Sequence, residues 1–121
     1  MPVRLLSSSI LKWPDAEAVD SAVRRWAGNV GQECEDVQMI GYFGSYARGD
    51  WGVGSDLDVV VVVGSSKRSF ERRGFEWDTT MLPVPVDLLV YTEQEWQSLT
   101  RQGRFGSSVL KEVVWVFMQP E

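Results

Sequence analysis

The first patterned segment of the chain is amphipathic. Acidic residues follow Pro14, as they do in the first turns of helices. Apolar residues then recur at the spacing of one helix face, which predicts that this face is buried, at Ala16, Val19, Val23 and Trp26. We expect a helix that begins at Pro14 and Asp15 and is ended by Gly28 and Gly31.

Four later segments have the composition of strands. Val37 to Phe43 and Val84 to Tyr91 are rich in apolar, β-branched and aromatic residues, which favour the extended conformation. Leu57 to Val63 contains five consecutive valines, and such a continuous run predicts a strand that is buried on both faces. Val113 to Met118 has the composition of a closing strand.

The remaining segments predict short helices and loops. Thr92-Glu93-Gln94-Glu95 has the pattern of a capping box, so we expect a helix to about Gln102, stopped by Gly103. Residues 107–112 predict another helical turn, and residues 65–77 a loop with a helical turn. Together the elements predict one α/β (α+β) domain over residues 1–121, a mixed sheet of about four strands flanked by helices.

Composition excludes several kinds of chemistry. The chain has no histidine and one cysteine, Cys34, which excludes Ser-His-Asp and Cys-His catalysis and an internal disulfide. Acid–base and metal chemistry therefore fall to carboxylates, which prefer hard cations such as Mg²⁺. The net charge of −5 argues against a nucleic-acid module without excluding one. Because there is no membrane-length apolar run and no signal-peptide pattern, we expect a cytoplasmic protein.

Three aspartates stand at or near strand ends. Asp56 and Asp58 are two residues apart at the entry to the valine-rich segment, and side chains at that spacing point to the same side of a strand. Asp87 lies in an apolar segment, where an unpaired carboxylate is costly. If the strands are neighbours, the three acids can hold two metal ions about 4 Å apart. Alternatively, Asp-x-Asp is a turn or a cap, and Asp87 is a buried acid paired with an arginine such as Arg48.

A glycine-serine turn offers the complementary chemistry. Gly44 lets backbone N–H groups approach a phosphate closely, and the hydroxyl of Ser45 adds a donor. A helical turn that begins at Ser45 would favour an anion, and Arg48 follows closely enough to pair with phosphate. Trp51, in the same loop, either stacks on a nucleobase or packs within the loop.

These residues resemble the signature of a known superfamily. Gly44-Ser45, ten residues and then Asp56-x-Asp58 is the pattern of the DNA polymerase beta-like nucleotidyltransferases, and residues 44–58 closely resemble its minimal nucleotidyltransferase (MNT) branch. The resemblance implies that the Gly-Ser pair contacts the triphosphate and that the acids hold Mg²⁺, with Asp87 as the third. The assigned catalytic and metal-binding residues are Asp56, Asp58 and Asp87; the nucleotide-binding residues are Gly44, Ser45, Arg48 and Ser55.

The resemblance also implies a function. It implies Mg²⁺-dependent transfer of a nucleoside monophosphate, AMP from ATP, to a hydroxyl acceptor, with two ions in the site. Of 121 residues only 34 follow Asp87, so a homo-oligomer or a partner is expected to complete the pocket. Relatives of this size resemble antitoxins that adenylylate helical HEPN-type partners in toxin–antitoxin modules.

Two other functions stay open on the sequence. One is a non-catalytic module that binds a nucleotide or a partner and acts by sequestration. The other is a transferase for small-molecule hydroxyls, as in antibiotic-modifying relatives. A basic segment predicts either a solvated loop or a contact with pyrophosphate or an acidic partner, at Lys67, Arg68, Arg72 and Arg73.

Overall fold

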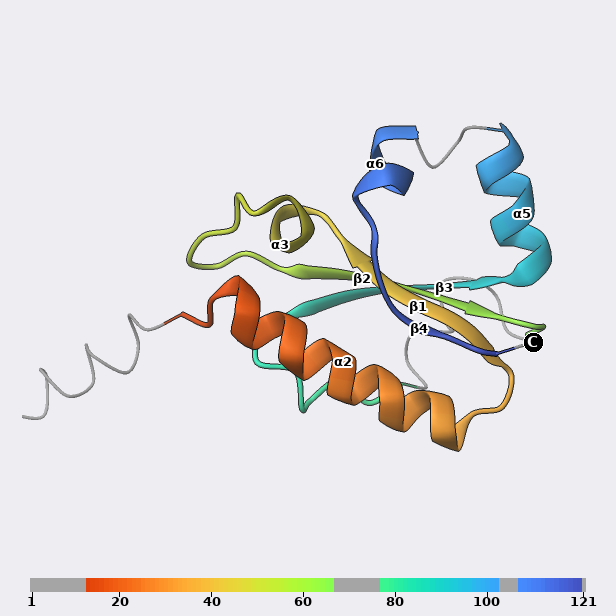
Figure 1. Cartoon of the computed structure of the whole chain (residues 1–121), viewed down its shortest axis with the longest axis horizontal. Helices are drawn as coiled ribbons and strands as arrows, with labels where there is room; N and C mark the ends of the chain where they lie inside the picture. Colours follow the sequence, from red (N-terminus) through yellow and green to blue (C-terminus); the bar gives the residue numbers. More distant parts are fainter. Residues whose placement is uncertain (1–12, 67–76, 103–106, 121) are drawn as a thin grey trace, which may run out of the picture.

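The computed structural model describes residues 13–66, 77–102 and 107–120. Within them the chain forms a four-stranded sheet in the order β3-β2-β1-β4 (Figure 1). Its strands are β1 (Val37–Phe43), β2 (Leu57–Val63), β3 (Val86–Thr92) and β4 (Val114–Met118). β1 is antiparallel to both β2 and β4, whereas β2 and β3 are parallel. The predicted small α+β fold with a mixed sheet is confirmed.

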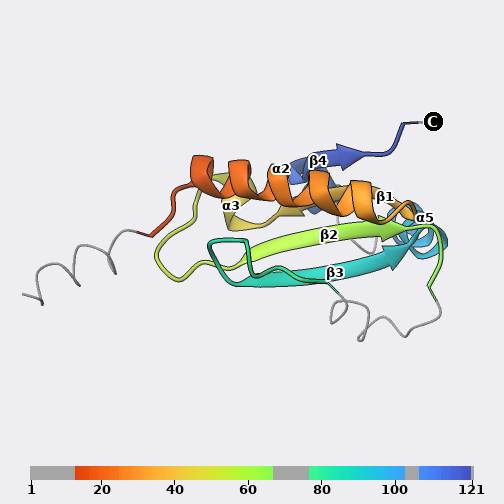
Figure 2. The same cartoon turned by 90° about the horizontal axis from the view of Figure 1, so that it is seen from below.

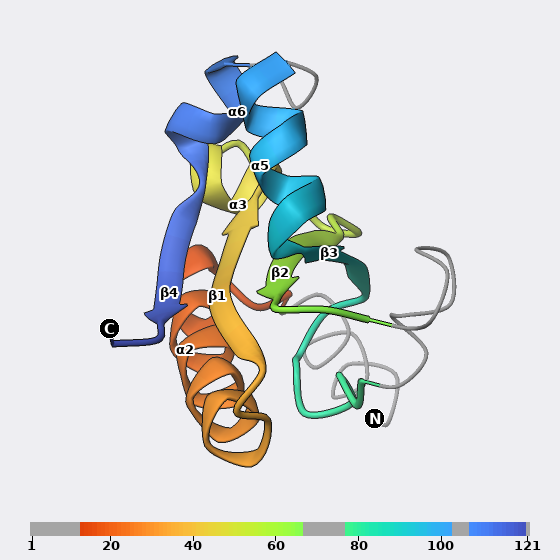
Figure 3. The same cartoon turned by 90° about the vertical axis from the view of Figure 1, so that its right-hand side faces the viewer.

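Helices lie on both faces of this sheet. α2 (Ala16–Glu33) covers one face and contacts β1 and β4, whereas α5 (Glu93–Gln102) contacts β3 and β2 from the other face (Figures 2 and 3). The short helices α3 (Ser45–Arg48) and α6 (Ser107–Glu112) adjoin the end of the sheet where β1 stops and β4 begins. In the part of the chain that the structure describes, no helix has the length and apolarity to cross a membrane.

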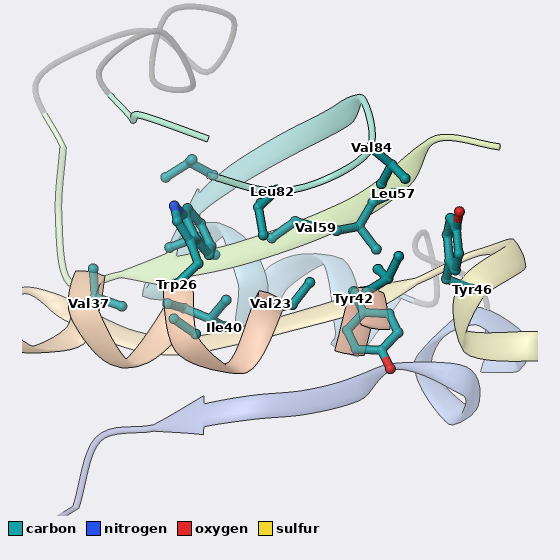
Figure 4. Close-up of a cluster of buried hydrophobic side chains, with 14 of the residues drawn as sticks. Val23, Trp26, Val37, Ile40, Tyr42, Tyr46, Leu57, Val59, Leu82 and Val84 are labelled. Atoms are coloured by element: carbon teal, nitrogen blue, oxygen red, sulfur yellow. The ribbon is translucent and has the colours of Figure 1, made fainter. Parts of the chain in front are cut away.

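β2 is the centre of the hydrophobic core. Val59 and Val61 pack on the α2 side of the sheet, and Val60 and Val62 pack on the α5 side. Residues 59–63 are all buried, which confirms the expected burial on both faces, and each valine stabilises the fold by about 1.5–3 kcal/mol. Figure 4 shows the α2-side cluster, into which Trp26 points.

α2 is longer than the sequence predicts. It begins after Asp15, whose carboxylate caps it by accepting the N–H of Ala18 at 2.8 Å, but it continues through Gly28 and Gly31 to Glu33. Gly31 lies within the helix, at the point where α2 packs against β4. A Cβ at this position would collide with the ring of Phe117 in β4, so the absent side chain allows helix and sheet to approach.

The segment between β2 and α5 also refines the prediction. β3 begins at Val86 and not at Val84, because Pro85 has no N–H for the ladder, although its carbonyl oxygen accepts the N–H of Leu57 at 2.8 Å. The capping box is present. The N–H of Thr92 is bound by the Glu95 carboxylate at 2.8 Å, and the N–H of Glu95 by the Thr92 hydroxyl at 3.2 Å.

Two predictions fall outside the described residues. They concern Gly103 as a helix stop and residues 67–76, which hold the predicted helical turn and the basic residues Lys67, Arg68, Arg72 and Arg73. At the end of the sheet, by contrast, every segment that carries predicted chemistry is described. The end of β1 and the beginnings of β2, β3 and β4 meet there. Residues from four distant parts of the sequence are therefore close together at this end of the sheet.

Candidate active site

Asp58 and Asp87 are neighbours across two strands. They are Cα partners in the parallel pairing of β2 with β3, so their side chains leave the sheet on the same face. By alternation along β2, this is the α5 face, on which Val60 is buried. Asp87 is exposed and Asp58 is partly buried. Asp87 is therefore not the buried acid of the alternative interpretation, and its proposed partner Arg48 pairs with other acids.

Crowded negative charge surrounds Asp58. Burial, the charge of Asp87 and the charge of Asp56 together raise the pKa of the Asp58 carboxyl above its ordinary value, and the positive charge of Arg48 opposes them. Like charges at short range and partial desolvation both disfavour the ionised form. A positive charge bound beside Asp58 would therefore relieve a cost that the fold imposes.

The glycine-serine turn lies directly against this acid. Gly44 has φ 83°, a conformation that favours glycine, and a Cβ on it would collide with Oδ2 of Asp58. Its carbonyl oxygen accepts the N–H groups of Ala47 and Arg48, both at 3.0 Å, which forms α3. The turn and the acidic strand, recognised as separate motifs in the sequence, are thus in contact.

A fourth carboxylate, missed by sequence reasoning, reaches the same place. Glu112 is the last residue of α6. Its Oε1 accepts the N–H of Gly44 at 3.2 Å and lies 3.4 Å from Nη1 of Arg48. In the sequence it is one glutamate before a strand, and only its position in the fold distinguishes it.

The other predicted residues have visible structural tasks. Nε of Arg48 lies 3.1 Å from Oδ2 of Asp50. The hydroxyl of Ser55 accepts the N–H of Gly52 at 2.8 Å and so closes the motif loop. Ser45 is the partly buried first residue of α3. Their roles in nucleotide binding remain predictions, because these contacts concern the folded loop alone.

Trp51 packs within the protein, as one of its two interpretations expected. Its ring stacks on Tyr46, with centroids 5.5 Å apart and planes at 10°. The Tyr46 hydroxyl accepts the indole N–H of Trp13 at 2.7 Å, and Trp51 packs on the core cluster on the α2 side. This arrangement favours packing within the loop over stacking on a nucleobase.

The donor set fits a hard divalent cation in kind. Asp56, Asp58 and Asp87 offer carboxylate oxygens alone, which Mg²⁺ prefers. Among the described residues, however, no three acidic or cysteine side chains are already gathered as a metal cage. Because Asp56 and Asp87 are exposed, their side chains can change rotamer at little cost.

Two hollows in the surface lie away from these acids. One of about 450 Å³ is lined by residues of β3 and α5, including Tyr91 and Leu99. Another of about 180 Å³ lies near the opposite end of β2, between Val63 and Trp77. Neither has a carboxylate of the acidic set in its lining, so the candidate site is identified by its chemistry and by the register of its strands.

Comparisons with known proteins bear on this fold. A crystal structure of a candidate nucleotidyltransferase from Sulfolobus solfataricus is similar, with a TM-score of 0.61 and 21% identity, over 86% of this chain and 84% of that chain. A toxin-antitoxin structure with AMP-PNP has a TM-score of 0.48 and 17% identity, over 83% of this chain and 73% of that chain. No curated protein matches the chain.

The family assignment rests on most of the sequence. The family described as the nucleotidyltransferase domain matches residues 24–115, which include the glycine turn, Asp58, Asp87 and Glu112. This chain therefore belongs to the nucleotidyltransferase domain family.

Proposed function

We propose that this protein transfers a nucleoside monophosphate, AMP from ATP, to a hydroxyl acceptor in a Mg²⁺-dependent reaction. One observation carries the proposal: Asp58 and Asp87 are in register on adjacent strands, and the Gly44 turn lies against Asp58. In this proposal the Gly44 turn holds phosphate and the neighbouring acids hold the cation. Nucleotidyl transfer needs that combination, because both substrate phosphates and the departing pyrophosphate are anionic.

Each residue has a task in the proposed reaction. The N–H of Gly44, the hydroxyl of Ser45 and the guanidinium of Arg48 orient the triphosphate. Asp56, Asp58 and Asp87 hold Mg²⁺, which when bound polarises the α-phosphate and stabilises the charge of the leaving group.

The bonds change at one phosphorus atom. The acceptor oxygen forms a bond to the α-phosphorus as the bond from that phosphorus to the bridging oxygen breaks, and pyrophosphate leaves. Asp87, the more exposed acid of the in-register pair, accepts the proton of the hydroxyl.

The proposed acceptor is a protein hydroxyl on a helical partner of the HEPN type. The close resemblance of residues 44–58 to the minimal nucleotidyltransferase branch supports this choice. The exposure of Asp56 and Asp87 supports it as well, since the acidic set also lies outside both described hollows. A partner would then form a second wall of the site.

The test is transfer of label from ATP labelled with ³²P at the α-phosphate, in Mg²⁺, with and without the protein encoded beside this one. We expect label on the neighbouring protein from α-labelled ATP and none from γ-labelled ATP, because the γ-phosphate leaves with pyrophosphate. Asp58→Asn should lower the rate by at least about 100-fold, the scale of losing a major electrostatic contribution.

Asp36→Asn is the matched control. Asp36 is an exposed aspartate just before β1, at the other end of the sheet, and its variant should label the acceptor at the wild-type rate. Transfer by Asp58→Asn at the wild-type rate would overturn the mechanism. Label from γ-labelled ATP would indicate phosphoryl transfer instead.

A second candidate function is nucleotide or partner binding without transfer. The observation that favours it is the absence, among the described residues, of three acids already gathered around one point. In the same assay this function predicts measurable ATP binding with no label on any protein. Neutralisation of the neighbouring protein by Asp58→Asn as well as by wild type would also support it.

A further inference from the structure

Glu112 contacts two groups that the proposed function assigns to the triphosphate, the N–H of Gly44 and the guanidinium of Arg48. Its carboxylate holds the N–H of Gly44 at 3.2 Å and lies beside the guanidinium of Arg48. The Glu112 side chain is only 18% exposed, against 49% for Arg48. A carboxylate this sheltered needs charge-assisted hydrogen bonds to offset its desolvation, so the contact is a specific one.

The sheet itself puts Glu112 there. In the antiparallel pairing of β1 with β4, Tyr42 is the partner of Val114. Gly44 follows Tyr42 by two residues, just beyond the end of β1, and Glu112 precedes Val114 by two residues, at the end of α6. The last pair of the two strands therefore lies close to both residues. A flexible surface side chain would not be held in this way.

We propose that Glu112 is an internal anion that stands in for phosphate at the Gly44 turn and is displaced when the nucleotide binds, which sets the affinity of the site for triphosphate. This inference rests on the proposed function. Glu112 and a phosphate oxygen would compete for the same N–H and the same guanidinium. Glu112 is also one of the negative charges that act on Asp58, so its displacement removes a repulsion where a polyanion arrives.

The test is binding of Mg²⁺-ATP and of Mg²⁺ with inorganic triphosphate to the full chain by calorimetry. Glu112→Gln keeps an oxygen that can accept the Gly44 N–H but removes the competing charge. It should lower the Kd of both probes about three- to tenfold, the scale of a partly exposed charge interaction. Glu33→Gln is the matched control, an exposed glutamate at the end of α2, and its Kd should equal that of wild type.

Arg48 gives an independent readout. If Glu112 and phosphate contend for the guanidinium, Glu112→Gln should gain less affinity in an Arg48→Gln background than in wild type. A residue that merely braces the turn would change the melting temperature and leave this coupling at zero.

The outcomes separate the two proposals. Tighter binding of both probes by Glu112→Gln, with the loss of gain in the Arg48→Gln background, supports the inference. If wild type binds ATP and Glu112→Gln binds it equally well or more weakly, the inference is overturned and the proposed function stands. The same holds if Glu112→Gln binds ATP more tightly but inorganic triphosphate no better than wild type does. If neither protein binds Mg²⁺-ATP, the proposed function fails and this inference fails with it.

Discussion

At the scale of single residues, the candidate site is a place of opposed requirements. Asp58 is held partly buried among like charges, and Gly44 keeps a left-handed φ so that the backbone can lie against it. Neither feature contributes to packing in the way that the valines of β2 do. Crowded acids and unusual backbone conformations are typical of functional sites, and here both occur at one point.

The first prediction concerns the stability cost of Asp58. Its pKa is raised in the folded state, first by burial and then by Asp87 and Asp56. The folded chain therefore holds this proton more tightly than the unfolded chain, so stability falls as pH rises from the unfolded pKa through the folded one and stays lower at neutral pH. Asp58→Asn should stabilise the metal-free protein at pH 7 by up to about 1 kcal/mol, allowing for solvent screening.

Chemical denaturation in EDTA at pH 7 and at pH 3 measures this effect. The gain from Asp58→Asn should be present at pH 7 and shrink at pH 3, where the wild-type carboxyl is protonated. A variant that is less stable than wild type at pH 7 would show that Asp58 makes favourable contacts that outweigh its crowding.

At the scale of elements, the glycines of α2 show why a helix end is hard to read from sequence. Gly28 and Gly31 both weaken a helix by propensity, and both predict its end. Only Gly31 meets another element: a Cβ there would collide with the Phe117 ring, whereas nothing lies within 4 Å of a Cβ on Gly28. Gly31 is thus required by the packing of α2 on β4, whereas no such contact requires Gly28.

Substitution of the two glycines by alanine tests this difference. Gly28→Ala should raise the free energy of unfolding by about 0.5–1 kcal/mol, because alanine is the better helix former and the space is open. Gly31→Ala should lower it by about 1 kcal/mol, because the collision with Phe117 outweighs the gain in propensity. Urea denaturation of both variants gives the comparison. Equal stabilisation by both substitutions would mean that the Phe117 ring of β4 moves at little cost to make room for the methyl group.

At the scale of the whole molecule, the site is a product of the sheet order. Gly44, Asp58, Asp87 and Glu112 come from the ends or beginnings of β1, β2, β3 and α6. The order β3-β2-β1-β4 puts β2 between the strand of Asp87 and the strand that leads to Gly44. Stability of the sheet and geometry of the site therefore depend on the same pairings.

Binding of the nucleotide should stabilise the entire fold in consequence. Mg²⁺-ATP at about 100 times its Kd should raise the free energy of unfolding by about 2.7 kcal/mol if it binds only the folded chain. Differential scanning calorimetry measures the shift, with Asp36→Asn as a control that should match wild type. Asp58→Asn should show a much smaller shift, and an equal shift would mean that binding does not use the acidic strand.

The sequence by itself determined most of the elements, and it predicted the kind of chemistry. Local patterns are sufficient for this: a run of β-branched valines favours a buried strand, and a capping-box pattern favours the start of a helix. The spacing of Gly44-Ser45 and Asp56-x-Asp58 carries the resemblance to the nucleotidyltransferases. Because the chain has no histidine, the sequence also predicted that acid–base and metal chemistry fall to carboxylates. The sheet of four strands and the neighbouring positions of Asp58 and Asp87 followed from the same reasoning.

Only the tertiary structure decided what depends on contacts between distant segments. It carried α2 past Gly31, because Phe117 of β4 packs there. It set Trp51 against Tyr46, and it left Asp87 exposed despite its apolar neighbours in the sequence. It also placed Glu112 on the Gly44 turn, 68 positions away in the sequence, because the pairing of β1 with β4 ends beside both residues. Such pairings follow from the strand order and its register, which no local pattern in the chain encodes.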